Sequence, residues 1–72
     1  MIDSAVYDVT GRIRLLLQAS PIADVRRIRV EQHGDEVRLE GRVRSYYAKQ
    51  MAQETVKRAV GRLHIVNSVT VD

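Results

Sequence analysis

Two histidines and four serines are the side chains of this sequence that could support acid–base, metal or nucleophilic chemistry. His33 lies in a turn-like segment close to acidic residues, but no second histidine or cysteine stands near it. His64 has no acidic neighbour in the sequence. Because a zinc site takes three or four ligands of these types, each histidine is interpreted as a surface side chain and no metal site is predicted.

The serines lack the surroundings that nucleophilic catalysis requires. None of them stands in a G-x-S-x-G elbow, and a hydrolase also needs a base and a group that orients that base. No G-x-G-x-x-G or Walker-type run supports nucleotide binding. We therefore predict that the protein is not an enzyme and has no catalytic residues and no cofactor.

A group of arginines and tyrosines favours a binding function. Tyr46 and Tyr47 follow Arg42 and Arg44, and the hairpin described below places Arg27 opposite Arg42. Arginine pairs with phosphates and carboxylates, and tyrosine prefers sites with one apolar and one wet side, including membrane interfaces. These five residues are the predicted lipid- or partner-binding site. The alternative is that one tyrosine packs against the sheet edge while the other is merely exposed.

Length and charge restrict the class of protein further. The 72 residues predict one domain, 1–72, and the absence of cysteine excludes disulfides. The net charge is +3, and ten of the twelve basic residues are arginine, although interspersed acids leave internal pairing open. Apolar runs are too short for a transmembrane helix. The first residues lack a secretory signal, which predicts a cytoplasmic location if the chain is complete; it could also be a piece of an exported protein.

Hydrophobic periodicity predicts two helices and three strands. The first helix covers 4–19, with a cap at Asp3 or Ser4 and an apolar stripe that includes Val6, Leu16 and Leu17. Alternation of apolar and polar residues predicts strands over 25–32, 37–44 and 63–71. A second helix should run from a cap at Ser45 to about residue 60.

Charge selects the register of the predicted hairpin. With Val30 opposite Leu39, Glu31 faces Arg38 and Arg29 faces Glu40, whereas a slip of two residues would place like charges together. In this register Gly41 belongs to the inward-facing set and lies opposite Ile28. Arg27, Arg42 and Arg44 are left without an acidic cross-strand neighbour.

The fold class that follows is α+β: a single α-β-β-α-β domain with a three-stranded sheet and two helices packed on one face. The sequence leaves the strand order open, because the last strand could join beside either member of the hairpin. Asn67 interrupts the apolar alternation of that strand and is expected to bond to a turn backbone.

Residues 37–45 read Val-Arg-Leu-Glu-Gly-Arg-Val-Arg-Ser. This segment resembles the V-x-L-x-G-x-V-x-S core of the BON domain (bacterial OsmY and nodulation). The end of the chain is similar to the family's G-x-x-x-V-x-N-x-L-x-V pattern, with Asn67 at its asparagine. Arg62 departs from the family, which has an apolar residue after the glycine, and Leu63 is expected to take that place by a small shift.

The resemblance implies a small α/β fold, an association with the bacterial envelope, periplasm or osmotic stress, and phospholipid binding without established catalytic residues. Together with the arginine and tyrosine group, it makes a module that binds anionic phospholipid or membrane surfaces the leading hypothesis. A protein-interaction or oligomerisation module is the alternative, because a three-stranded sheet exposes two edges. Nucleic-acid binding is a distant third, since the chain has no G-x-x-G loop between helices and only a small net charge.

Overall fold

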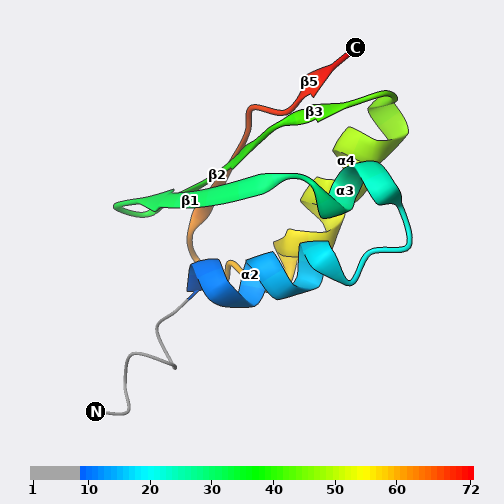
Figure 1. The fold of residues 1–72 in the computed structure, drawn as a ribbon. Helices are drawn as coiled ribbons and strands as arrows, with labels where there is room; N and C mark the ends of the chain where they lie inside the picture. The colour runs from blue at the N-terminus through cyan, green and yellow to red at the C-terminus, as the bar shows by residue number, and fades with distance from the viewer. Residues whose placement is uncertain (1–8) are drawn as a thin grey trace.

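The computed structural model describes residues 9–72, which form three helices and five short strands (Figure 1). The helices are α2 (Val9–Gln18), α3 (Ala23–Arg26) and α4 (Tyr46–Lys57); the strands are β1 (Arg29–His33), β2 (Glu36–Glu40), β3 (Arg42–Val43), β4 (His64–Asn67) and β5 (Thr70–Val71). The predicted helix cap at Asp3 or Ser4, and Val6, lie outside the described residues. Within residues 9–72, no helix is both long and apolar enough to cross a membrane.

Helix α2 buries a narrower stripe than the sequence predicts. Ile13 and Leu17 are buried and Val9 packs against the core, but Leu16 is 40% exposed, so its assignment to the apolar stripe is only partly right. The helix ends before Pro21, and Ser20 accepts a hydrogen bond from the backbone N–H of Ile22. The residue before proline is disfavoured in the α region, which explains where the helix stops.

The segment predicted to begin the first strand is instead the short helix α3. In a strand, Val25 would share the outer face with Arg27 and Arg29, because side chains alternate. One helical turn places Val25 on the same side as Ile28, three residues later, and both are buried. Burial of Val25 thus explains why strand pairing starts only at Arg29.

Strands β1 and β2 form the predicted antiparallel hairpin in the predicted register. Val30 pairs with Leu39, and Arg29 and Glu31 pair with Glu40 and Arg38. The close side-chain contacts of these acidic residues nevertheless form along each strand. Nε2 of His33 lies 3.1 Å from Oε1 of Glu31, and Arg38 forms an ion pair with Glu36 at 3.5 Å. The register was therefore predicted correctly, but its cross-strand charges are neighbours rather than close contacts.

The last part of the chain joins β2 and β3, which settles the strand order. Strand β4 runs parallel to β2, giving the order β1-β2-β4, and β5 runs parallel to β3. Between the two ladders the N–H of Thr70 donates to the carbonyl of Gly41 at 2.9 Å. The predicted strands 37–44 and 63–71 are thus each interrupted once. The hydrogen bond at Gly41 keeps the two segments side by side across the interruption.

Helix α4 starts at its predicted cap, since the Ser45 hydroxyl accepts a hydrogen bond from the N–H of Ala48 at 3.1 Å. It ends at Lys57, before the predicted end, and a turn containing Gly61 leads into β4. Figure 1 shows α2 and α4 on the same side of the sheet. The core between these layers includes Leu39, Ala52 and Val56, so the α+β class with helices on one sheet face is confirmed, with α3 as an additional helix.

Candidate binding surface

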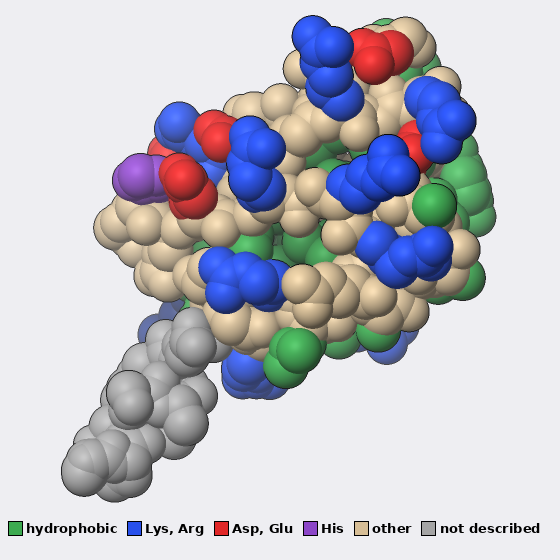
Figure 2. Space-filling view, viewed as in Figure 1, with side chains coloured by type: hydrophobic (Ala, Val, Ile, Leu, Met, Phe, Trp, Pro, Cys, Tyr) green, Lys and Arg blue, Asp and Glu red, His purple; other side chains and the backbone are tan. Residues whose placement is uncertain are grey.

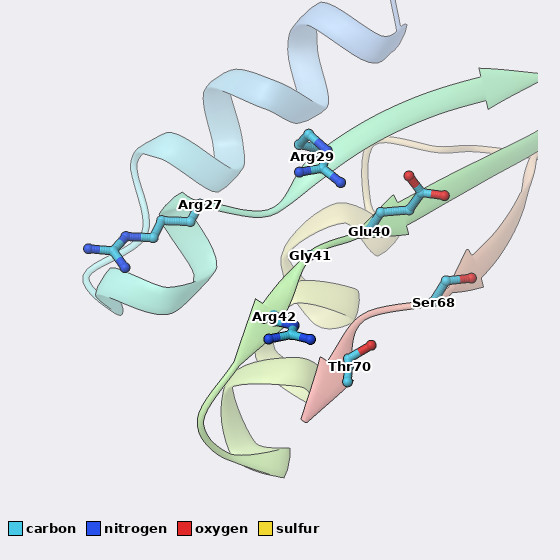
Figure 3. A pocket seen from close by; sticks show the side chains of 7 residues that line it. All are labelled: Arg27, Arg29, Glu40, Gly41, Arg42, Ser68 and Thr70. Carbon is cyan, nitrogen blue, oxygen red and sulfur yellow. The ribbon is translucent and has the colours of Figure 1, made fainter. Parts of the chain in front are cut away.

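The outer face of the sheet, away from α2 and α4, is hollowed where the strands are interrupted. This hollow has a volume of about 600 Å³ and is open to solvent. It is lined by Arg27, Arg29, Glu40, Gly41, Arg42, Ser68 and Thr70 (Figure 3). Since Gly41 at its centre carries no side chain, the backbone itself forms part of the floor. We refer to these seven residues as the Gly41 hollow.

Positive charge dominates the Gly41 hollow. Three arginines face one acidic residue, Glu40, and no ion pair with a carboxylate is formed by Arg27, Arg29 or Arg42 among residues 9–72. Figure 3 shows Arg29 and Arg42 near Gly41, whereas the guanidinium of Arg27 extends away from it. One guanidinium group can donate two parallel hydrogen bonds to two oxygens of a phosphate or carboxylate. The hydroxyls of Ser68 and Thr70 can donate to the same oxygens.

Arg29 was not among the predicted site residues, and the structure adds it to Arg27 and Arg42. The hairpin register pairs Arg29 with Glu40, and this pairing of opposite charges predicts that the charge of Arg29 is neutralised. The side chain of Glu40 in fact lies beyond ion-pair distance of Arg29. Arg29 therefore contributes its charge to the hollow.

Arg44 does not join this group, because it is held by an acidic residue that the sequence did not connect with it. Its Nη2 lies 3.2 Å from Oδ1 of Asp24, and its backbone N–H donates to Oδ2 at 2.8 Å. Asp24 belongs to α3, and its side chain is only 13% exposed. The sequence predicted Arg44 as one of three arginines without an acidic cross-strand neighbour. Its acidic partner comes instead from α3, whose placement beside β3 the sequence did not reveal.

The contact between Asp24 and Arg44 predicts a dependence of stability on pH. The hydrogen bond from the Arg44 side chain, followed by that from its backbone N–H, lowers the pKa of Asp24. A lowered pKa in the folded state gives stability that is present above the unfolded-state pKa and is lost as pH falls through the folded-state value. Asp24→Asn should therefore flatten the fall of the urea midpoint between about pH 6 and about pH 3. Parallel profiles for the two proteins would contradict this role.

The two tyrosines begin α4 and are both exposed, Tyr46 by 77% and Tyr47 by 66%. The alternative in which one of them packs against the sheet edge is therefore wrong. Tyr46 borders a separate small hollow with Lys49 and Asn67, not the Gly41 hollow. The five predicted residues thus do not form one patch: Arg27 and Arg42 share the hollow, and the tyrosines lie at the start of the helix that follows β3.

Asn67 has a structural role at the break between β4 and β5. Its carbonyl oxygen accepts from the N–H of Val69 at 3.2 Å, which confirms the expected bond to a turn backbone. Its amide group also donates to the carbonyl of Lys49 at 3.1 Å and to Gln53 at 3.2 Å. These bonds tie α4 to the end of β4 and satisfy the polar group that interrupts the apolar pattern.

The model of the BON domain family matches this chain over residues 7–72. The chain belongs to the BON domain family. The BON domain is a binding-type domain and not a known catalytic family. A comparison with curated proteins finds no significant match.

The departure of this BON domain at Arg62 is accommodated as expected. Arg62 is exposed in the turn after Gly61, while Leu63 is half-buried and packs against the core. A shift of one residue thus supplies the apolar contact at the corner between helix and strand.

The histidines of this BON domain lie at the surface, and Nε2 of His33 lies 3.1 Å from Oε1 of Glu31. No group of three or more metal-ligating side chains occurs within residues 9–72. The arrangement of charges in the Gly41 hollow is therefore the feature on which a binding function can be argued.

Proposed function

We propose that this BON domain is a non-catalytic module that binds anionic phospholipid at membrane surfaces, as part of a bacterial envelope or stress-related protein, and that the Gly41 hollow provides the contact. The observation that carries the proposal is the set of three arginines, Arg27, Arg29 and Arg42, without carboxylate partners within residues 9–72. Family membership supports it, because phospholipid binding is a function proposed for BON domains.

The position of the arginines suits a planar anionic surface. They stand on the outer sheet face, which neither α2 nor α4 covers. Figure 2 shows Lys and Arg side chains spread over one side of the molecule, with Asp and Glu side chains beside some of them. Each basic residue near an anionic membrane contributes about 1 kcal/mol. Three such residues give weak binding that depends on salt and on the fraction of anionic lipid.

Tyr46 and Tyr47 supply a second, apolar contribution to the proposed contact. Both rings are exposed, and only Arg44 and Ser45 separate Tyr46 from the end of β3 in the chain. Tyrosine rings prefer the depth of the lipid headgroups, where the ring is partly buried and the hydroxyl stays wet. In this proposal the tyrosine rings insert among the lipid headgroups, while the arginines attract the anionic membrane surface.

Sedimentation with vesicles tests the proposal. We expect the protein to bind vesicles of phosphatidylglycerol mixed with phosphatidylcholine and not vesicles of phosphatidylcholine alone. Arg42→Glu should reduce the partition coefficient roughly tenfold, since it replaces an attraction by a repulsion. Arg62→Glu is the matched control, because it makes the same charge change at an exposed residue outside the Gly41 hollow. Equal, negligible binding to both vesicle types would refute the proposal, and equal losses in the two variants would refute the role of the hollow.

A further inference from the structure

Strand β1 forms a free edge of the three-stranded sheet, whose order is β1-β2-β4. On the other side of β2, the carbonyls of Asp35 and Leu39 accept from the N–H groups of His64 and Ser68. In a strand, the backbone N–H and C=O groups of successive residues point to opposite sides. Because the odd-numbered residues Asp35 and Leu39 face β4, the even-numbered residues of β2 direct their backbone groups toward β1. The register pairs these even-numbered residues of β2 with the odd-numbered residues of β1.

Val30 and Gln32, the residues of β1 at even positions, therefore direct their backbone N–H and C=O groups away from the sheet. No other strand among residues 9–72 lies on that side. Such a row of donors and acceptors can pair with an additional strand. Gln32 is an exposed residue of this edge strand, and its side chain donates to the carbonyl of Gly34 in the turn that follows β1.

A groove of about 460 Å³ runs beside this edge, between β1 and the helices α2 and α3. It is lined by Arg14, Gln18, Arg26, Arg27, Ile28, Arg29, Val30 and Glu31. Four arginines thus oppose one acidic residue, Glu31, which already contacts His33. Arg26 donates to the carbonyl of Ser20, and no ion pair is formed by Arg14, Arg27 or Arg29 within the described part of the chain.

We propose that the edge of β1 docks an extended acidic segment of another protein, which adds to the sheet as a further strand. Backbone pairing with Val30 and Gln32 provides affinity for any extended chain, and the four arginines select one that carries carboxylates. A second copy of this chain fits the edge less well, because it would bring two sets of four arginines together. The proposal does not depend on phospholipid binding.

A labelled peptide in which Glu alternates with Val is the probe, and its affinity is measured by fluorescence anisotropy. Gln32→Pro removes the outward N–H of the edge and places the proline ring there, a change that edge strands tolerate. It should weaken peptide binding at least about tenfold. Gln32→Ala is the matched control: it also loses the side-chain bond to Gly34 but keeps the N–H, and it should bind as the parent does.

Charge is tested separately from backbone pairing. Arg14→Glu should weaken binding of the Glu peptide, and a peptide with Lys in place of Glu should not bind the parent. Arg42→Glu lies outside the groove and should leave peptide binding unchanged while it weakens vesicle binding, so the failure of either proposal is distinguishable. Thermal unfolding of each variant establishes that it is folded. The proposal is overturned if the Glu and Lys peptides bind equally, if neither binds, or if Arg14→Glu has no effect.

Discussion

Gly41→Val should lower the free energy of unfolding by about 2–4 kcal/mol. Gly41 has a φ of +145°, which side chains with a Cβ rarely adopt, so any substitution strains the backbone. A Cβ at this position would lie 3.5 Å from Cα of Ile28, an ordinary van der Waals contact, and the two methyl groups of valine add bulk beside Ile28. Gly41 lies beside Ile28, as the register predicted, although it also lines the hollow on the outer face of the sheet. The backbone conformation adds a cost that the sequence did not reveal.

Urea unfolding of three variants separates these causes. Gly41→Ala should be destabilised by the backbone strain alone and lie between the parent and Gly41→Val. Arg42→Ala, an exposed neighbour, should stay within about 0.5 kcal/mol of the parent. If Gly41→Val were as stable as the parent, the backbone of Gly41 could not be held as it is between β2 and β3.

Leu39→Ala should cost about 2–5 kcal/mol, the range for removing a large buried side chain and leaving a cavity. Leu39 is completely buried in β2, the central strand of the sheet, between its partners Val30 in β1 and Asn67 in β4. A domain of this size has a margin of only a few kcal/mol from its core. We therefore expect a large fraction of the variant to be unfolded at 37 °C, measured by circular dichroism and urea titration.

Leu15→Ala makes the same chemical change at a residue of α2 that is 68% exposed. Its cost should remain within about 0.5 kcal/mol. Similar losses in Leu39→Ala and Leu15→Ala would show that the core is not organised around β2, and would contradict the arrangement of helices on one sheet face.

Local patterns were sufficient for much of the fold. Alternation of residues predicted the hairpin, opposite charges predicted its register, and Ser45 predicted the start of α4, because each depends on neighbours along the chain or on one strand partner. The class of fold and the family followed from the same patterns. The sequence also identified Arg27 and Arg42 as arginines without an acidic cross-strand neighbour, and both line the Gly41 hollow.

Contacts between distant segments decided the rest. Val25 reaches the core only through a helical turn, so α3 replaced the expected start of a strand. That turn places Asp24 beside Arg44, twenty residues away, and removes Arg44 from the binding group. The parallel pairing of β4 with β2 leaves β1 as a free edge. Neither the apolar alternation nor the charges along the chain could predict that β4 joins β2 and not β1. The sequence thus determined which elements form and which arginines lack an acidic neighbour across the hairpin. The packing of α3 and β4 decided which of those arginines remain free of a carboxylate partner within residues 9–72. Burial and long-range pairing decide this because they depend on the whole chain.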